Sequence, residues 1–313
     1  MTQPIIIDCD PGQDDAVMLL LALASPEQLE ILGITTCAGN VPLDLTQRNA
    51  RLICELAGRP DIPVFAGDSA PMVRPLFTAE NVHGNTGIDG ADIYEPSIPL
   101  QEQHAVEFII NTLESARDNS IILVPTGPLS NIGRAIMKQP AILPKIREIV
   151  LMGGACREGG NSTPSAEFNI YVDPQAADIV LNCGRPITIA SLDISHQVFT
   201  TKRRLERFRA LDSAVGRATA GMLDFFNRHD SGKYGGEGAP LHDPTTIAYL
   251  LSPELFQGKI CNVTIETESE LTMGHTAVDF WHVTSRHPNV NWLYHIDADG
   301  FFDLLIDRLA CYD

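Results

Sequence analysis

The alternation of short apolar strands with helical segments constrains the fold of this chain more than any other feature. β-Branched runs precede helical patterns, as in "PIIIDCD" then "DDAVMLLLALAS", "ILGITTCAG" then "LDLTQRNARLICELAG", and "SIILVPTG" then "LSNIGRAIMKQ". The alternation continues through "REIVLMGGA", "DPQAADIVLNCG" and "PITIASLDIS". This order predicts βαβ units on a parallel sheet. Because the strands are continuously apolar, we expect helices on both faces of that sheet.

The pattern changes after about residue 200. A helical stretch, "TTKRRLERFRALDSAVGRATAGMLDFFNRH", is followed by strand-like segments, "KICNVTIETES", "HTAVDFWHVTS" and "VNWLYHID", and then by a closing helix, "GFFDLLIDRLACY". No repeat or long linker divides the chain, so we expect one α/β domain over residues 1–313, with a mainly helical C-terminal embellishment. In such sheets the ligand site lies at the carboxyl ends of the parallel strands.

Charge and composition exclude several classes of partner. Forty acidic residues against 22 basic ones give a net charge of −18, which repels polyanions, so we expect no nucleic acid polymer as a partner. The longest apolar runs, such as "AVMLLLALA", are about half the roughly 20 residues that a membrane span needs. The N-terminus has no pattern of a secretory signal. A cytoplasmic enzyme is therefore expected.

The cysteines indicate neither disulfides nor zinc. The seven are odd in number, scattered along the chain and without any C-x-x-C pair. We expect reduced and mostly buried thiols.

Four aspartates crowd the end of the first predicted strand, in "IIIDCDPGQDD". Asp8 and Asp10 lie two apart, on one face of the strand end, and Asp14 and Asp15 fall at the start of the next helix. One acidic residue there is ordinary as a helix cap, but several carboxylates within about 4 Å repel by several kcal/mol unless a proton or cation lies between them. An all-oxygen ligand set favours Ca²⁺ or Mg²⁺ over zinc.

Polar loops after other strands are candidates to complete this site. "VPTGPLSN" ends a strand at Thr126, which offers a neutral oxygen ligand or only a turn. "PLHDP" places His242 and Asp243 before a helix, where either residue alone is ordinary. "NVHGNTGIDG" is a glycine-rich loop that carries His83, and such a loop is often only a mobile surface turn.

A further loop offers groups suited to a sugar. "GNSTPSAEFNIYVDP" holds Asn161, Glu167 and Asn169, which together supply the donors and acceptors that a polyhydroxyl ligand requires.

These motifs together resemble one known family. "DCDPGQDDA", "AGN", "NVHGNTGIDG", "PTGPLSN", "MGGA", "AEFNIYVDP" and "PLHDP" are similar, in content and in order, to the inosine-uridine preferring nucleoside hydrolases. The similarity is greatest to the bacterial pyrimidine-specific ribonucleoside hydrolases and covers nearly the whole chain. It implies a Rossmann-like, mostly parallel sheet flanked by helices, the nucleoside hydrolase fold. It also implies a homo-oligomer, as dimers and tetramers occur in the family.

The resemblance assigns roles residue by residue. A Ca²⁺ ion would be held by Asp10, Asp15, the main-chain carbonyl of Thr126 and Asp243, with Asp8 beside this shell. The ribose would be surrounded by Asp14, Asn40, Met152, Asn161, Glu167 and Asn169. His83 and His242 would lie beside the base.

The resemblance also implies a reaction. Cleavage of the bond between C1′ and the base nitrogen builds positive charge on the ribose ring, which carboxylates stabilise. Ca²⁺ would hold the attacking water and the 2′ and 3′ hydroxyls, and Asp10 would accept the proton of that water as general base. His242 would protonate the departing base or form a hydrogen bond to it.

Two departures from the family pattern concern the substrate. Many members carry His where this chain has Gln13, but that position is no matched ligand. The purine-specific branch stacks its base on tryptophan, whereas the matching loop position here is His83 and the only tryptophans are Trp281 and Trp292. Pyrimidine ribonucleosides such as uridine and cytidine are therefore the expected substrates, with a nonspecific inosine-uridine hydrolase as the alternative. Tyr234 either packs against the base or only anchors its loop.

Two other classes of protein share part of this pattern. The D-x-D motif after a first strand also opens the haloacid-dehalogenase-like phosphatases, but their following Thr and later lysine have no clear counterpart here. A non-catalytic nucleoside-binding protein would need the ribose contacts without Asp10 and the activated water.

Overall fold

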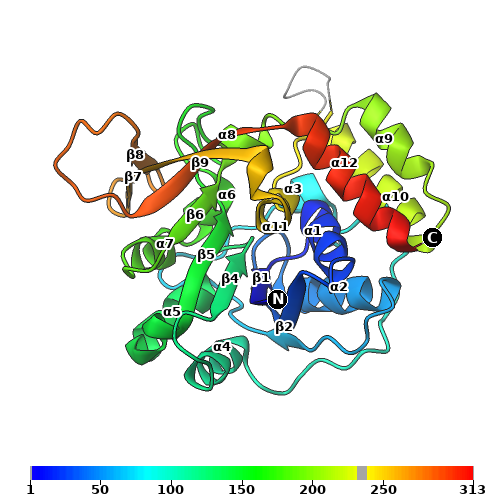
Figure 1. Ribbon diagram of the computed structural model, residues 1–313, viewed down its shortest axis with the longest axis horizontal. Helices are drawn as coiled ribbons and strands as arrows, with labels where there is room; N and C mark the ends of the chain where they lie inside the picture. Colours follow the sequence, from blue (N-terminus) through cyan, green and yellow to red (C-terminus); the bar gives the residue numbers. More distant parts are fainter. Residues whose placement is uncertain (1, 231–237, 313) are drawn as a thin grey trace.

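A nine-stranded sheet forms the centre of the computed structural model, which describes residues 2–230 and 238–312 (Figure 1). In spatial order the strands are β3 (Val64–Ala66), β2 (Leu29–Thr36), β1 (Gln3–Cys9), β4 (Ile121–Pro125), β5 (Ile146–Met152), β6 (Ile187–Ala190), β9 (Val290–Ile296), β7 (Phe256–Ile265) and β8 (Thr276–Asp279). The pairs from β3 to β9 are parallel, and β7 runs antiparallel to both β9 and β8. The α/β, mostly parallel sheet predicted from the sequence is confirmed.

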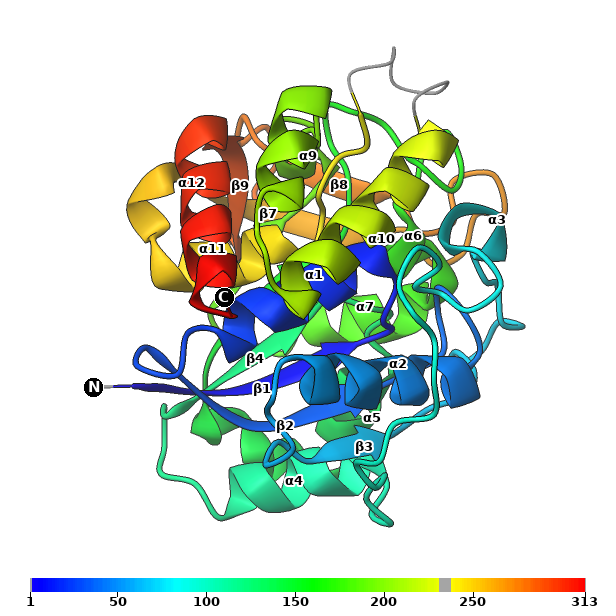
Figure 2. The ribbon, with the colours of Figure 1, turned by 90° about the vertical axis from the view of Figure 1, so that its right-hand side faces the viewer.

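Helices cover both faces of the sheet (Figure 2). One layer contains α1 (Gln13–Leu23), α2 (Leu43–Leu56), α9 (Lys202–Arg209), α10 (Ala214–Asp230), α11 (Pro244–Leu251) and α12 (Ala298–Leu309). The other contains α4 (Ala105–Glu114), α5 (Ser130–Lys138) and α7 (Pro174–Leu181). The remaining helices are short: α3 (Glu80–His83), α6 (Phe168–Val172), α8 (Leu192–Ser195), η1 (Pro140–Lys145), η2 (Pro253–Leu255) and η3 (Ala310–Tyr312).

The apolar run of β1 follows from this two-sided cover. Ile5 and Ile7 belong to the core under α1 and α2, whereas Ile6 belongs to the core under α4 and α5. Successive side chains of a strand point to opposite faces, so a strand buried on both faces needs an apolar residue at every position. Each such isoleucine contributes roughly 1.5–3 kcal/mol through burial.

The segment after residue 200 contributes both to a helical layer and to the central sheet. Its helices α9 and α10 join the layer over α1, and its strands β7, β8 and β9 lengthen the central sheet. The short strand β3 and the helix α4 lie in a stretch for which the sequence patterns gave no element.

The strand order reverses between β1 and β4. From β1 the chain proceeds outward through β2 and β3, and it then returns to place β4 on the other side of β1. Loops that leave the carboxyl ends of two such strands turn to opposite faces and leave a crevice between them. The aspartates after β1 and Thr126 after β4 lie at this point, and the main-chain N–H of Thr126 donates to the carbonyl of Asp8.

The cysteines form no disulfide in the described part of the structure. All seven cysteines fall within the described residues as free thiols, and four of them are buried. Among the described residues, no helix is both long and apolar enough to cross a membrane.

Candidate active site

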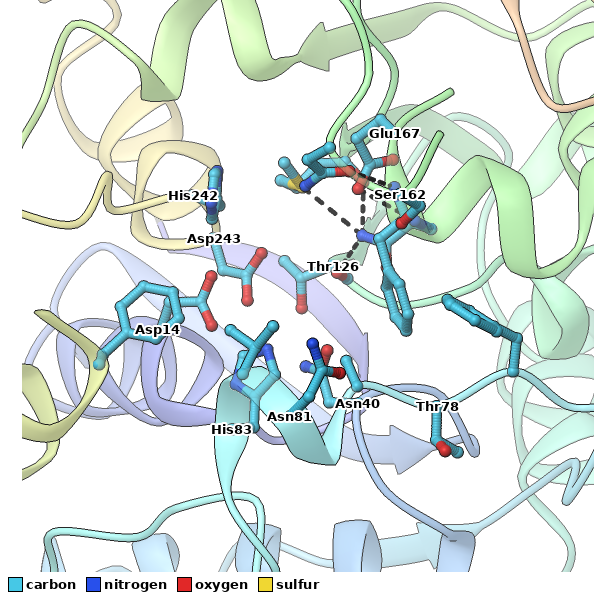
Figure 3. A pocket seen from close by; sticks show the side chains of 18 residues that line it. Asp14, Asn40, Thr78, Asn81, His83, Thr126, Ser162, Glu167, His242 and Asp243 are labelled. Atoms are coloured by element: carbon cyan, nitrogen blue, oxygen red, sulfur yellow. Dashed lines mark hydrogen bonds between the residues drawn. The ribbon is translucent and has the colours of Figure 1, made fainter. Parts of the chain in front are cut away.

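A pocket opens at the crevice between β1 and β4 and contains most of the residues that the sequence singled out (Figure 3). Asp14 and Asp243 lie at one end of it, between His83 and His242, and Glu167 lies towards the other end. The predicted residues in its lining are Asp14, Asn40, His83, Thr126, Met152, Asn161, Glu167, Asn169, His242 and Asp243. They come from loops and short helical segments that are distant in sequence and that follow β1, β2, β3, β4 and β5 or precede α11.

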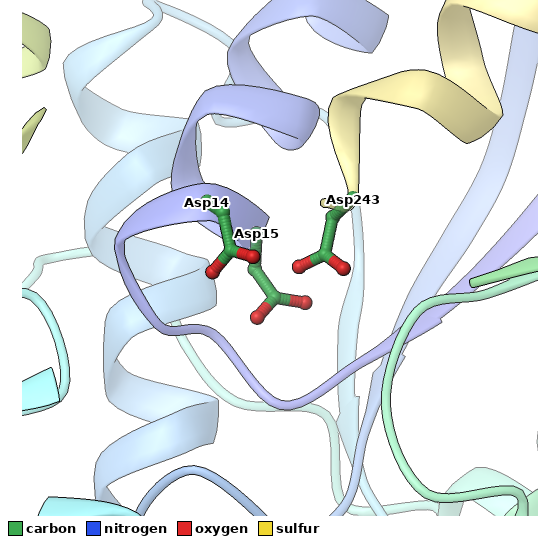
Figure 4. A group of neighbouring side chains, drawn as sticks. All are labelled: Asp14, Asp15 and Asp243. Carbon is green, nitrogen blue, oxygen red and sulfur yellow. The ribbon is translucent and has the colours of Figure 1, made fainter. Parts of the chain in front are cut away.

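Three carboxylates converge at the end of the pocket where Asp14 and Asp243 lie (Figure 4). Asp14, Asp15 and Asp243 are all buried, and each offers an oxygen within 4.8 Å of the others. Asp14 and Asp15 stand in the first turn of α1, and Asp243 stands at the N-cap of α11. Both helix N-termini carry partial positive charge, which favours carboxylates there, but half charges cannot neutralise three anions.

Asp10 and Asp15 are fully buried and are not part of the described pocket lining. Asn40 joins them, because its main-chain N–H donates to Asp10 Oδ2 at 2.7 Å and its side-chain Nδ2 donates to Asp15 Oδ2 at 3.1 Å. Asp15 Oδ1 accepts from the hydroxyl of Thr126 at 2.9 Å. Gly39 permits this packing, since a Cβ there would lie 2.0 Å from Asp10 Oδ2.

The carboxylates bear an electrostatic cost that a cation would remove. Burial raises the pKa of Asp10 and of Asp243 well above the usual range, and repulsion by neighbouring aspartates adds to it. Burial also raises the pKa of Asp15. Asp10 Oδ1 is buried and has no hydrogen-bond partner within the described part of the chain. An orphaned oxygen in an all-oxygen group of anions fits a hard divalent cation.

The other end of the pocket is built around Glu167. Its Oε1 accepts from the N–H of Asn169 at 3.0 Å and its Oε2 from the N–H of Gly154 at 3.0 Å, so it caps α6. Asn169 Nδ2 donates to the carbonyls of Thr126, at 2.7 Å, and Met152, at 3.2 Å. These bonds tie the loops after β4 and β5 together. They leave carboxylate and amide groups facing a space suited to hydroxyl groups.

Two histidines stand at the aspartate end. The Nδ1 of His242 lies 2.7 Å from the hydroxyl of Ser195, a buried residue of α8. The Nδ1 of His83 lies 2.8 Å from Oε1 of Gln13, and the His83 ring stacks on Phe226 of α10 with centroids 5.5 Å apart.

The pKa of Glu167 predicts how stability depends on pH. Burial raises this pKa from near 4.5 to about 7. The native state thus binds the proton more tightly than the unfolded chain, so the associated stability is complete below pH 4.5 and is lost as pH rises through 7. Without divalent cations, the free energy of unfolding from urea titrations should fall between pH 5 and 7.5 by on the order of 3 kcal/mol more than in Glu167→Gln. Parallel profiles for the two proteins would contradict this.

Several other residues line the pocket, namely Phe77, Thr78, Asn81, Ser162, Phe168 and Phe226. Asn81, Ser162 and Phe168 stand within the quoted motifs but were not singled out. Phe77, Thr78 and Phe226 lie outside those motifs, and only the fold brings them to the pocket. Asp10 and Asp15 are not part of the described lining. Tyr234 is outside the described residues.

Neither tryptophan lies in the pocket lining of the described chain. Trp292 is fully buried in the sheet and donates to Asp193, and Trp281 is 76% exposed.

Comparisons with known proteins identify the family of the chain. The sequence model of the inosine-uridine preferring nucleoside hydrolases matches residues 5–303. A pyrimidine-specific ribonucleoside hydrolase, RihA, of Shewanella sp. strain MR-7 is 50% identical over 313 residues, which cover 100% of this chain and 98% of the relative. An uncharacterised protein of Schizosaccharomyces pombe is 50% identical over 306 residues, with 98% of each chain covered.

Solved structures of nucleoside hydrolases have a similar fold. A purine-preferring ribonucleoside hydrolase from Gardnerella vaginalis superposes with a TM-score of 0.92 at 32% identity, and 99% of each chain is covered. The plant nucleoside hydrolase PpNRh1 superposes with a TM-score of 0.92 at 31% identity, also over 99% of each chain.

Fold, pocket and relatives define a hydrolase that acts on N-glycosyl compounds. The chain belongs to the inosine-uridine preferring nucleoside hydrolase family, as its motifs predicted. Its activity is the hydrolysis of ribonucleosides, which sets the phosphatase alternative aside. The family is metal-dependent, and the buried aspartates form a group able to bind a metal ion.

Proposed function

We propose that this enzyme hydrolyses pyrimidine ribonucleosides, uridine and cytidine above all, to the free base and ribose. The observation that carries the proposal is the pocket itself, in which buried carboxylates lie beside amide and carboxylate groups suited to a ribose. The pyrimidine preference is supported by relatives named as pyrimidine-specific, whose sequences are 49–50% identical to this one over the full chain. The position of both tryptophans outside the described pocket lining supports it further.

Calcium is the proposed cation. Asp10, Asp15, the carbonyl of Thr126 and Asp243 would hold it, in keeping with the all-oxygen donor set and the orphaned Oδ1 of Asp10. When bound, the ion supplies positive charge that offsets the carboxylates, binds sugar hydroxyls and acidifies a neighbouring water. Thr126 keeps a lone pair for this role, because a carbonyl oxygen has two and Asn169 uses one.

The ribose is assigned to the polar groups around the pocket. Asp14 accepts hydrogen bonds from sugar hydroxyls at the carboxylate end, and Asn161 and Glu167 do so at the other. Asn40 and Asn169 supply amide donors and acceptors, and Met152 forms an apolar wall.

The chemical step is assigned to Asp10 and His242. The Oδ1 of Asp10 accepts a proton from the attacking water, because it has no hydrogen-bond partner among the described residues, whereas Oδ2 already accepts from the N–H of Asn40. Positive charge on the ribose ring in the transition state is stabilised by the surrounding carboxylates. His242, held at Nδ1 by Ser195, protonates the departing base through its other nitrogen or donates a hydrogen bond to it. His83 contacts the base beside it.

Three broader features belong to the same proposal. Residues 1–313 act as one nucleoside hydrolase domain, which the continuous sheet supports. The family resemblance supports a homo-oligomer, either a dimer or a tetramer, that works in the cytoplasm. Analytical ultracentrifugation tests the oligomeric state.

A substrate panel tests the proposal. Ribose release is measured with a reducing-sugar assay on uridine, cytidine, inosine, adenosine and 2′-deoxyuridine, without added phosphate. We expect kcat/KM for uridine and cytidine to exceed that for inosine by at least about tenfold. The deoxy substrate should be weak, because it lacks a hydroxyl that the carboxylates recognise. Equal rates on inosine would show a nonspecific hydrolase, and binding without ribose release would show a nucleoside-binding protein.

Uridine 5′-monophosphate is a matched control. The described pocket lining contains carboxylates but no lysine or arginine. A phosphate dianion there would be repelled without compensation, so the nucleotide should be hydrolysed at least about 100-fold more slowly than uridine. Comparable rates would contradict the proposed position of the ribose.

A further inference from the structure

Gln13 links the aspartate loop to the loop that carries His83. It is the first residue of α1, directly before Asp14, and its side chain is fully buried. Its Nε2 donates to the carbonyl oxygens of His83, at 2.9 Å, and Asp89, at 3.3 Å. Its Oε1 lies 2.8 Å from His83 Nδ1. One amide thus contacts both the main chain and the ring of the same histidine.

These contacts determine which nitrogen of His83 carries hydrogen. Main-chain carbonyls only accept hydrogen bonds, so the end of the Gln13 amide that faces them must be the NH₂ group. The end that faces His83 is then the carbonyl oxygen, which also only accepts. A hydrogen bond at 2.8 Å therefore requires hydrogen on His83 Nδ1. In the neutral ring, Nε2 is then an acceptor.

Packing also fixes the orientation of the His83 ring. His83 is 7% exposed and stacks on Phe226 with an interplanar angle of 27°. The ring also packs closely on Gly12, where a Cβ would lie 2.4 Å from His83 Nδ1. The ring therefore cannot turn over without leaving Gln13.

We propose that Gln13 is a positioning residue that determines base specificity: it holds His83 as the Nδ1–H tautomer, so that the neutral ring meets the base as an acceptor. The part about the base rests on the proposed function. A base edge with an N–H group, such as N3–H of uracil or the 4-amino group of cytosine, can donate to this acceptor. His242 differs, because the hydroxyl of Ser195 can donate or accept and so does not determine its tautomer.

Asn49 provides a matched control. It is fully buried, and its Nδ2 donates to the carbonyls of Pro11, at 3.0 Å, and Thr86, at 2.7 Å. It thus ties the same two loops as Gln13, but the hydrogen bonds of its side chain within the described residues are to Pro11, Thr86 and Arg48 and not to His83. Gln13→Met and Asn49→Leu each remove such a tie, and only the first removes the acceptor of the His83 N–H.

The tautomer is measured directly. Long-range ¹H–¹⁵N NMR spectra of the whole protein near pH 8 distinguish Nδ1–H from Nε2–H rings, and His83→Asn identifies the His83 signals by their loss. We expect an Nδ1–H ring in the wild type and in Asn49→Leu, and an Nε2–H population in Gln13→Met. A wild-type ring with hydrogen on Nε2 overturns the proposal even if no variant folds. So does an unchanged Nδ1–H ring in Gln13→Met.

Kinetics test the consequence for the base. Gln13→Met should lower kcat/KM for uridine about tenfold, against less than about threefold for Asn49→Leu. It should also narrow the preference for uridine over 3-methyluridine, which lacks N3–H. An unchanged preference overturns the role in specificity. If the wild type releases no ribose from any nucleoside, the proposed function fails, and the NMR measurement still decides the tautomer independently.

Discussion

Replacement of Asp10 by Asn is expected to lower kcat for uridine hydrolysis about 10³-fold and to leave the fold intact. An Asn side chain has the shape of Asp and keeps an acceptor oxygen for the N–H of Asn40, which Asp10 Oδ2 now binds at 2.7 Å. It places an NH₂ group where the orphaned Oδ1 stands. That group cannot take a proton from water, and removal of a general base typically costs 10²–10⁴-fold in rate.

The control is an aspartate of equal burial outside the pocket. Asp173 is fully buried, and its carboxylate accepts from the N–H of Met72, the hydroxyl of Ser130 and the N–H of Ala176. Asp173→Asn removes the same charge from the interior without touching the pocket lining. It is expected to lower the melting temperature while kcat stays within about threefold of the wild type. Circular dichroism of both variants reports the fold, and full activity of Asp10→Asn would exclude Asp10 as the base.

Removal of divalent cations is expected to abolish ribose release and to destabilise the protein. Buried aspartates with raised pKa values repel one another when no cation lies between them. A cation that binds only the native state adds about 2.7 kcal/mol of stability at 100 times its dissociation constant. After treatment with EGTA and gel filtration, we expect at least about a 100-fold loss of kcat and a lower melting temperature. Ca²⁺ should restore both.

Variants of the proposed ligands separate loss of the cation from general damage. Asp243→Asn should weaken Ca²⁺ binding, measured by isothermal titration calorimetry, and excess Ca²⁺ should restore part of its activity. Asp173→Asn should bind Ca²⁺ as the wild type does. Metal analysis confirms that the treated protein is free of cations. Full activity of that metal-free protein would contradict a catalytic cation, and restoration by Mg²⁺ but not by Ca²⁺ would contradict the choice of ion.

The sequence predicted the strands and the type of sheet because these depend on local patterns of apolar and polar residues. A continuous apolar run such as Ile5–Ile7 indicates a strand buried on both faces, and the aspartates that follow it indicate a site at its carboxyl end. Motifs in the family's order then identified most of the pocket lining, from Asn40 to Asp243. The short strand β3 has too few residues to show any period.

The hydrogen bonds that orient His83 and His242 could not be predicted from the sequence, for a different reason. Gln13 and His83 are 70 residues apart, and Ser195 and His242 are 47 apart. The sequence shows Gln13 only as a departure from the family's usual His, and Ser195 is ordinary in its segment, so only the packed fold shows what each side chain touches. Phe226, on α10, reaches the pocket for the same reason.

The place of β9 in the sheet has a consequence for biosynthesis. This strand pairs in parallel with β6, although roughly 100 residues separate them in the chain. While the ribosome makes that stretch, at about 5–20 residues per second, the edge of β6 waits for its partner for roughly 5–20 seconds. An apolar strand edge pairs readily with foreign strands. The nascent enzyme is therefore most open to aggregation, and most dependent on chaperones, after its aspartate loop has formed but before β9 has left the ribosome.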